Sequence, residues 1–327
     1  MADRDTSIRP IARTVTQRLR LARVWRWLIH VGMLAIVAGV SYIILLPLLT
    51  KVSASWMTEG DLYDAAVRWI PRSPTVENYQ TVWRLMNYPR ALVNSLGLAL
   101  CASALQVAAC TLTAYGLARF NFRGKGLLFT LVIFTLMVPP QVLMTPLYLN
   151  FRYFNMLGIL RKPINLVNTP YPLLFMSLTG TGLRNGLFIY ILRQFFRGLP
   201  TELEEAAYVD GAGLFRTFYA IMLRQVTPAL VVTFLFAFVW QWNESFYTSL
   251  LMPQLELMPN ALLSIAARYA ESQKLASATV GPATVTPLML SILDGAGMVL
   301  YVVPLLVLFA LMQRHFVESV ERTGLVG

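Results

Sequence analysis

The residues best suited to recognising another molecule lie in one polar segment, residues 201–213, of an otherwise apolar chain. Thr201 and Glu204 have the spacing of a capping box, in which each side chain bonds the backbone amide of the other. Glu204 and Glu205 would stand at the positive end of the helix dipole, which favours carboxylates. Gly211 follows where a positive φ would end that helix. This pattern predicts a short acidic helix that docks by charge and shape.

Small and apolar residues complete the segment. Ala206 and Ala207 favour helix and leave a smooth surface, and Asp210 directly precedes the glycine. A second amphipathic piece follows and ends near Leu223, and its apolar side chains recur at three- and four-residue steps that share one face: Leu214, Phe215, Phe218, Ile221 and Met222. On these residues alone, an interfacial hairpin on the membrane, with Arg216 and Arg224 at lipid phosphates, is an open alternative.

Catalytic and metal-binding patterns are missing from the sequence. Gly124-Lys125 is the only Gly-Lys pair, and no phosphate-binding loop surrounds it. The chain has neither a nucleophile elbow nor a zinc-binding His-Glu pattern, and its two histidines, His30 and His315, predict no metal site. We therefore expect a non-catalytic protein with no cofactor of its own.

The composition predicts the elements that hold this segment. Hydrophobic residues make up 57% of the 327 residues, charged residues 13%, and the mean hydropathy is +0.59, values typical of a polytopic membrane protein. A spanning helix needs about 20 apolar residues. The sequence predicts an all-α bundle with six membrane spans, at about 27–49, 91–118, 126–149, 172–196, 225–248 and 291–313.

The distribution of charge predicts the orientation and the domain limits. With six spans, 16 of the 27 Lys and Arg residues fall on the side of both termini, which the positive-inside rule makes cytoplasmic. The predicted parts are a basic segment 1–26, a transmembrane domain 27–316 and a tail 317–327. The polar segment then lies in the cytoplasm between spans four and five. The net charge of +11 follows from topology and lipid attraction and requires no nucleic acid.

Several residues inside the predicted spans are unusual there. Pro139-Pro140 and Pro304 predict kinks or breaks. Cys101 and Cys110 are too far apart along one helix to form a disulfide, and we expect both to be buried packing residues. Arg184 either lies inside the fourth span or is placed in an external loop by a break at Gly180-Thr-Gly182, and the sequence leaves both open.

The spacing Glu205-Ala-Ala, three residues, Gly211, nine residues, Ile221-x-Leu223 closely resembles the signature loop of bacterial ABC-importer permeases. Further motifs resemble the maltose-type carbohydrate class of that family: Asn94-Ser-Leu96, Tyr115-Gly-Leu-Ala-Arg119, Trp242-Asn-Glu-Ser-Phe246 and Gln313-Arg-His-Phe316. The chain departs from the pattern at Arg224, which replaces a proline, at the inserted Ser245, and at its ending Gly324-Leu-Val-Gly327, which lacks a lysine. The resemblance covers about residue 27 to the C-terminus.

The resemblance implies a permease subunit in a bacterial inner membrane, with both termini cytoplasmic. In that family the Glu-Ala-Ala helix couples to a cytoplasmic ATPase dimer, which binds ATP and Mg. The expected coupling residues are Glu204, Glu205, Ala206, Ala207, Asp210, Gly211, Ile221 and Leu223. The further expected partners are a second homologous permease and an external solute-binding protein, which would dock on residues 50–90 and the outer loops.

Polar groups inside the spans are candidates for a carbohydrate path: Asn94, Gln241, Trp242, Asn243 and Glu244, together with Gln106, Asn185 and Trp240. For any one of them, a role as an interhelical hydrogen-bonding partner is the favoured interpretation. Three other readings of the chain also stay open. It could be an ABC permease for another solute, a stand-alone channel or secondary transporter, or a non-transporting scaffold or receptor subunit. The sequence does not name the sugar.

Overall fold

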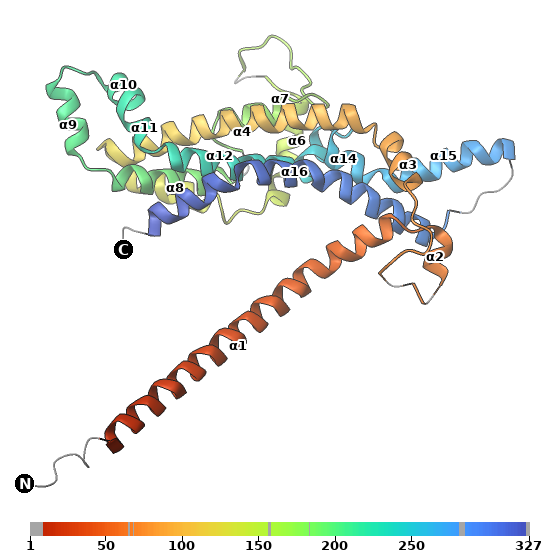
Figure 1. The fold of residues 1–327 in the computed structure, drawn as a ribbon. Helices are drawn as coiled ribbons and strands as arrows, with labels where there is room; N and C mark the ends of the chain where they lie inside the picture. Colours follow the sequence, from red (N-terminus) through yellow and green to blue (C-terminus); the bar gives the residue numbers. More distant parts are fainter. Residues whose placement is uncertain are drawn as a thin grey trace, which may run out of the picture.

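The structure is a computed structural model that describes residues 9–64, 66–67, 69–155, 158–182, 184–280 and 285–324. Within these residues the regular elements are helical, and the sole β contact is one isolated bridge between Phe154 and Ile164. The bundle is built on helices that run side by side (Figure 1): α4 (Tyr88–Arg119), α8 (Asn185–Gly198), α12 (Thr227–Trp242) and α16 (Pro287–Gly324). The predicted all-helical class is confirmed for the described residues.

The number of membrane-length helices is smaller than the predicted six. Among the described residues, three helical stretches are long and apolar enough to cross a membrane: Trp25–Ser55, Tyr88–Arg119 and Pro287–Leu311. A bent pair, Leu214–Gln225 and Thr227–Trp242, meets at 77° and would make a fourth span if counted together. The other predicted spans are divided into shorter helices, so the count of six stays a prediction.

Prolines and left-handed residues divide the third and fourth predicted spans. The third consists of α5 (Lys125–Phe134), the 3-10 turn η1 (Pro140–Leu143) and α6 (Met144–Arg152), which confirms the break predicted at Pro139-Pro140. The fourth consists of α7 (Tyr171–Leu178) and α8, and the gap between them contains Gly180 with a φ of 72°. The main chain therefore leaves helical geometry inside both segments.

Of the two outcomes predicted at Pro304, a kink or a break, the break is absent from α16. The helix continues from Pro287 to Gly324 with the proline inside it. A proline removes the hydrogen bond to the carbonyl four residues earlier, which here belongs to Leu300. The Tyr88 hydroxyl donates to that carbonyl oxygen at 3.1 Å. A neighbouring helix thus satisfies the freed acceptor, which is how membrane helices tolerate internal prolines.

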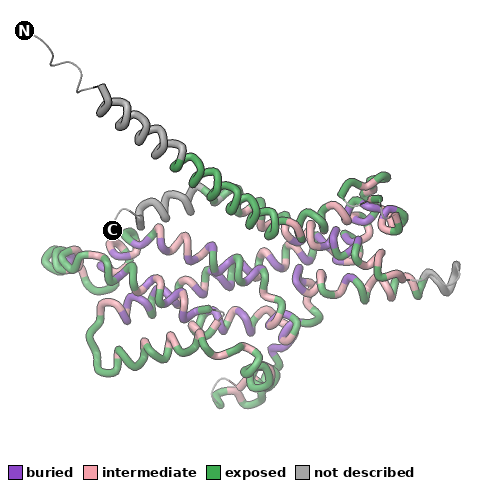
Figure 2. The backbone as a smooth tube through the Cα atoms, turned by 90° about the horizontal axis from the view of Figure 1, so that it is seen from below, coloured by how far each residue is buried: buried purple, intermediate pink, exposed green. Residues whose placement is uncertain are grey.

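Small residues let α4 lie at the centre of the bundle. Ala91, Ser95, Ala99, Ala102 and Ser103 are all buried on it, so neighbouring backbones approach closely. Of the two cysteines on this helix, Cys110 is buried as expected but Cys101 is exposed, because it lies on the opposite face. Figure 2 shows buried positions running along α4, α8, α12 and α16.

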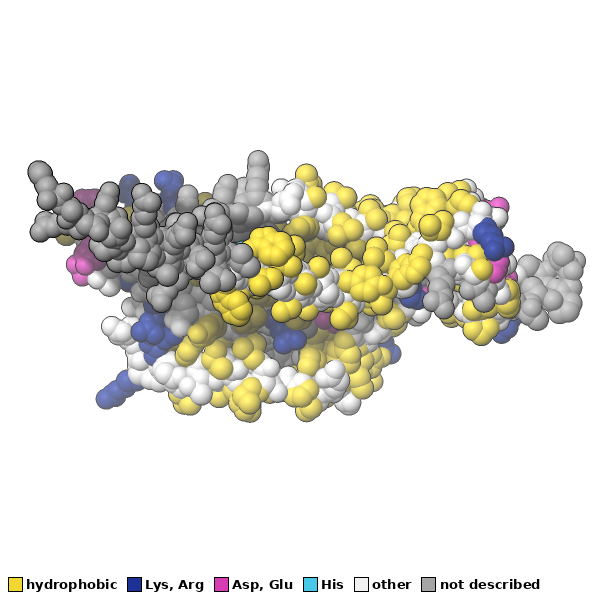
Figure 3. Space-filling view, turned by 60° about the horizontal axis from the view of Figure 1, so that its bottom comes forward, with side chains coloured by type: hydrophobic (Ala, Val, Ile, Leu, Met, Phe, Trp, Pro, Cys, Tyr) yellow, Lys and Arg dark blue, Asp and Glu magenta, His cyan; other side chains and the backbone are white. Residues whose placement is uncertain are grey.

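The first helix stands apart from the bundle. α1 (Arg9–Ser55) diverges from it in Figure 1 and is exposed along its described side chains, except near its C-terminal end. There Lys51 Nζ forms an ion pair with Asp294 Oδ2 at 2.6 Å. Hydrophobic side chains also cover much of the face seen in Figure 3. Such apolar surface fits a multi-pass membrane protein, since lipid hydrocarbon does not penalise it.

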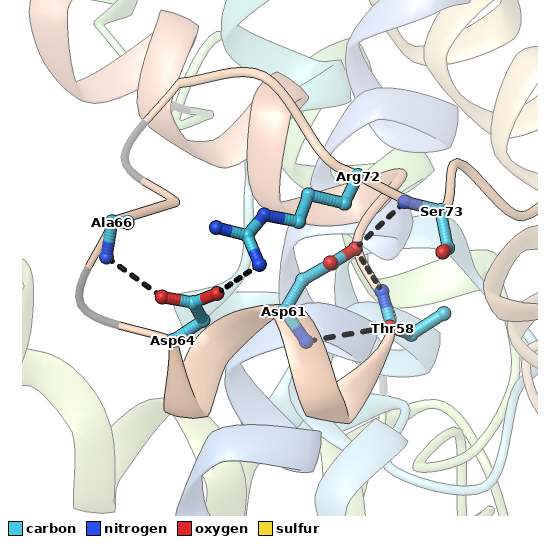
Figure 4. Close-up of polar contacts among 6 residues, drawn as sticks. All are labelled: Thr58, Asp61, Asp64, Ala66, Arg72 and Ser73. Carbon is cyan, nitrogen blue, oxygen red and sulfur yellow. Dashed lines mark hydrogen bonds and ion pairs between the residues drawn. The ribbon is translucent and has the colours of Figure 1, made fainter.

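The end of the bundle where α1 joins carries a small polar cap made of α2 (Glu59–Tyr63) and α3 (Glu77–Leu85). Thr58 and Asp61 form a capping box at the start of α2, and Arg72 pairs with Asp64 at 2.7 Å (Figure 4). Asp61 also accepts a hydrogen bond from the Ser73 amide at 3.5 Å. Three further helices lie between α12 and α16 in the chain: α13 (Phe246–Leu251), α14 (Met258–Leu263) and α15 (Ile265–Val280).

Candidate functional site

The polar segment forms a helical hairpin that projects from the opposite end of the bundle to the α2–α3 cap (Figure 1). Its first arm is α9 (Glu202–Val209). Its second arm consists of consecutive short pieces: α10 (Leu214–Arg216), the π-helical turn η3 (Thr217–Met222) and α11 (Leu223–Gln225). All eight expected coupling residues lie on this hairpin.

Glu204 anchors the hairpin to the end of α4. Its Oε1 accepts a hydrogen bond from the Tyr115 hydroxyl at 2.9 Å and lies 3.7 Å from Arg119 Nε. Arg119 also donates to the Leu199 carbonyl oxygen at 2.8 Å. The predicted capping box is not formed, because Thr201 has helical backbone angles (φ −69°, ψ −27°) and makes no side-chain cap bond, while the Glu204 carboxylate binds Tyr115 instead. The Arg119 and Glu204 side chains are only 8% and 12% exposed, so solvent screens this pair little.

An aromatic cluster reinforces the anchor. The Tyr115 ring lies 5.3 Å from the Phe196 ring and 4.7 Å from the Phe218 ring, measured between centroids. These three residues belong to α4, α8 and η3, and Phe196 is fully buried. Such contacts stabilise by about 0.5–1.5 kcal/mol each beyond area burial. The hairpin is therefore packed onto two bundle helices and not merely tethered to them.

A second cation, Lys125, binds carbonyl oxygens at the same end of α4. Lys125 Nζ donates to the carbonyl oxygens of Ala118 at 3.2 Å and Phe120 at 2.8 Å, which lie at the C-terminus of that helix. Desolvation lowers the pKa of the Lys125 ammonium, and the nearby positive charges of Arg193 and Arg197 lower it further. This end of the bundle is thus strongly positive next to the hairpin.

Gly211 makes the turn between the two arms. Its φ is 80°, in the left-handed region that the sequence predicted for a helix stop. The Gly211 amide donates to the Tyr208 carbonyl at 3.0 Å, and the Ala212 amide donates to the Ala207 carbonyl at 2.9 Å. These bonds satisfy carbonyls that the end of α9 would otherwise leave free.

The two alanines of the motif face different ways. Ala206 is exposed, whereas Ala207 is 3% exposed and packs inward, because successive helical residues point about 100° apart. The smooth outer face predicted for both residues therefore belongs to Ala206 alone, beside the exposed Glu205 and Asp210. Large apolar side chains of the hairpin are also exposed: Tyr208, Val209, Leu214, Phe215 and Tyr219.

The second arm does not present the single apolar face expected of it. Phe215 is 90% exposed, while Met222 is fully buried, because the π-helical turn shifts the register between them. Ile221 and Leu223 are half-buried. The arm ends at Gln225 before the 77° bend, despite Arg224 in the proline position.

A buried chain of amides crosses the bundle at one level. Gln241 Nε2 donates to Gln106 Oε1 at 3.1 Å, and Gln106 Nε2 donates to Asn185 Oδ1. These side chains come from α12, α4 and α8. Each lies 13 or 14 residues from the hairpin end of its helix, which is about 20 Å at 1.5 Å per residue. All three residues are at most 7% exposed, so they act as interhelical hydrogen-bonding partners in this structure.

The fold and the hairpin agree with a comparison against protein families. The model for the "binding-protein-dependent transport system inner membrane component" family matches residues 108–322, from α4 through the hairpin into α16. The chain belongs to this family.

Relatives of this inner membrane component are transport permeases. The chain is 27% identical to the diacetylchitobiose uptake system permease protein NgcG of Streptomyces coelicolor, over 86% of the chain and 84% of the relative. It is 24% identical to the arabinooligosaccharides transport system permease protein AraQ of Halalkalibacterium halodurans, over 92% of the chain and 96% of the relative. A solved bacterial ABC transporter for the acidic polysaccharide alginate matches with a TM-score of 0.65 and 20% identity, over 87% of this chain and 96% of that one.

The other candidate path residues make hydrogen bonds to groups outside the amide chain. Asn94 donates to the Glu256 carbonyl oxygen at 3.0 Å. Trp242 is 1% exposed, and its carbonyl oxygen accepts a hydrogen bond from the Tyr301 hydroxyl at 2.9 Å. Glu244 Oε1 accepts the Tyr247 amide at 2.6 Å, at the start of α13. The Asn94 amide and the Glu244 carboxylate thus have partners, whereas the buried indole Nε1 of Trp242 has no hydrogen-bond partner among the described residues. Of these candidates, Gln241 joins Gln106 and Asn185.

Two contacts that anchor the hairpin were not predicted from the sequence. Tyr115 and Arg119 were part of a family motif, but their contact with Glu204 was not expected. A signal was present, since both lie on one helix face at i and i+4 in its last turns, beside the acidic segment. Among the described residues, no group of three or more His, Cys, Asp or Glu side chains could hold a metal ion.

Proposed function

We propose that this chain is the permease subunit of an ATP-driven (ABC) importer for a carbohydrate. With a second permease it would form the path for a sugar delivered by an external binding protein, and a cytoplasmic ATPase dimer would bind ATP and Mg. Both termini would be cytoplasmic, as the excess of Lys and Arg on that side supports. Family membership and the sugar-permease relatives support this function.

The observation that carries the coupling role is the anchor at Glu204. The hairpin presents Glu205, Ala206 and Asp210 outward, while Glu204 and Ala207 face the bundle. A force applied by an ATPase to the outer face would reach α4 through Tyr115 and Arg119. The hairpin would then act as a lever that moves packed helices between inward- and outward-facing states.

A pair of cysteine variants tests the docking face. Ala206→Cys should crosslink to the ATPase subunit of the assembled complex, because position 206 is exposed. Ala207→Cys is the matched control, and it should not crosslink, because position 207 is 3% exposed. The native Cys101 and Cys110 belong to α4 and not to the hairpin. Equal crosslinking from both positions would contradict the proposed docking face.

The transport role has its own test. The complete complex, reconstituted in liposomes with its binding protein, should hydrolyse ATP faster when a carbohydrate ligand is added. Failure of every carbohydrate in a broad panel to stimulate hydrolysis would contradict carbohydrate import. A homo-oligomer purified without ATPase or second permease would instead support a channel.

A further inference from the structure

Arg184 is a charged side chain in an unusual place. It lies in the gap between α7 and α8, has a φ of 58° and is exposed. Its guanidinium carbon lies 4.5 Å from the centroid of the Trp240 ring, which is 39% exposed. Within the described part of the chain, Arg184 forms no ion pair with a carboxylate. Its positive charge is therefore stacked on an aromatic face and is not neutralised by any carboxylate that the structure describes.

The position of this pair along the bundle is fixed by its neighbours. Asn185 directly follows Arg184 and belongs to the amide chain, about 20 Å from the hairpin end of α8. Trp240 directly precedes Gln241, which belongs to the same chain on α12. A hydrocarbon core is about 30 Å thick, so both residues lie within membrane depth. A charged residue at that depth is costly in lipid and belongs beside water, protein or ligand.

The surroundings of the pair are polar and open. Thr179 and Thr181, in the same gap, join their hydroxyls at 2.9 Å and are exposed. Asn243, one helical turn beyond Trp240, is also exposed. The N-terminus of α8 adds the positive end of its dipole beside Arg184. The site thus combines an aromatic platform, neutral hydrogen-bonding groups and unneutralised positive charge.

We propose that Arg184 and Trp240 form a subsite of the transport path that binds a carbohydrate bearing a carboxylate or phosphate group. This proposal rests on the proposed carbohydrate-importer function and adds the charge of the substrate. The part of the indole that the guanidinium leaves exposed supplies an apolar surface for a sugar ring, and the exposed hydroxyl and amide groups suit sugar hydroxyls. The guanidinium presents paired donors that match carboxylate and phosphate oxygens. A neutral sugar would leave this charge uncompensated at membrane depth.

The test compares anionic and neutral carbohydrates of matched size on the complete complex with its binding protein. The probes are oligogalacturonides, galacto-oligosaccharides, hexose phosphates and hexoses, and the readouts are stimulated ATPase activity and uptake into liposomes. The variants are Arg184→Gln, Arg184→Lys and Trp240→Leu. Arg161→Gln is the matched control, because Arg161 is an exposed arginine of a loop outside the bundle helices.

We expect an anionic carbohydrate to stimulate the wild-type complex more than its neutral counterpart. Arg184→Gln should reduce that stimulation by about tenfold or more, the loss expected when charged hydrogen bonds are removed. Arg184→Lys should retain part of it, Trp240→Leu should lower it, and Arg161→Gln should match the wild type. Whether uronates or phosphorylated sugars respond identifies the acidic group.

Three results would overturn the subsite. Stimulation by neutral carbohydrates alone would show that the substrate is not anionic. Unchanged stimulation in Arg184→Gln would show that the anion binds elsewhere. Loss of the second permease from purified Arg184→Gln complex would show that Arg184 pairs with that subunit. Absence of stimulation by any carbohydrate is a different failure, because it contradicts the importer function itself.

Discussion

Replacement of Gly211 by valine tests whether the hairpin must hold its turn. A Cβ at Gly211 would meet no heavy atom within 4 Å, so the substitution causes no collision. The cost comes from the backbone, because φ is 80° and left-handed geometry costs an L-residue about 1–2 kcal/mol. A β-branched residue lies at the upper end of that range. The native turn would lose about 5- to 30-fold in population relative to other conformations.

Two further variants separate backbone strain from side-chain size. Gly213 lies in the same hairpin with an extended backbone, φ −74° and ψ 166°, and its Cβ would also meet open space. Gly213→Val should therefore behave like the wild type. Gly211→Asn should retain more activity than Gly211→Val, because asparagine adopts left-handed geometry more readily.

The assay measures ligand-stimulated ATPase activity and uptake by the assembled complex, with membrane content as the control for insertion. We expect Gly211→Val to lower stimulated activity by about the same 5- to 30-fold while insertion stays normal. Equal activity of Gly211→Val and Gly213→Val would refute the reasoning. An asparagine variant as impaired as the valine variant would also refute it, since strain would not then be the cause.

Three predictions concern the bundle and use thermal unfolding of the purified protein. Gly186→Ala should lower Tm through an overpacking cost of about 1–3 kcal/mol, because the new Cβ would lie 2.6 Å from a backbone oxygen of α5. Gly198→Ala, on the same helix with open space around it, should not lower Tm. Equal Tm shifts in the two variants would contradict the close packing at Gly186. Gln106→Leu should destabilise by about 1–3 kcal/mol, because the buried amides on α8 and α12 lose their shared partner; an unchanged Tm would show that water replaces it. Asp294→Asn should change the free energy of unfolding by less than about 1 kcal/mol, because the side chains of this ion pair are largely solvated, Asp294 being 55% exposed and Lys51 35% exposed. A larger loss would mean that this ion pair holds α1 against α16.

Local features of the fold were predictable where a residue acts on its own neighbours. The break at Pro139-Pro140 follows from a missing amide donor, and the turn at Gly211 follows from the freedom of glycine to take positive φ. Pro304 shows the limit of this reasoning. Its freed carbonyl is satisfied by Tyr88, which is 212 residues from Leu300 in the chain, so the helix continues.

In the candidate site, too, local features were predictable from the sequence and long-range contacts were not. The sequence placed an acidic helix, a glycine turn and a second apolar arm in order, and it marked the amides on three predicted spans. It did not predict that Glu204 would leave its local cap for Tyr115, 89 residues earlier. Nor did it predict that Ala206 and Ala207 would separate into exposed and buried positions, because burial depends on what packs against the helix.

By itself the sequence determined the membrane class and the spacing of the hairpin, because composition and local backbone chemistry are properties of consecutive residues. Only the tertiary structure decided which groups the hairpin is anchored to, which amides meet, and that Arg184 lies over Trp240 at the level of those amides. These outcomes depend on contacts between residues far apart in the chain. Several residues have the same chemistry, and the packing of the helices determines which of them come into contact.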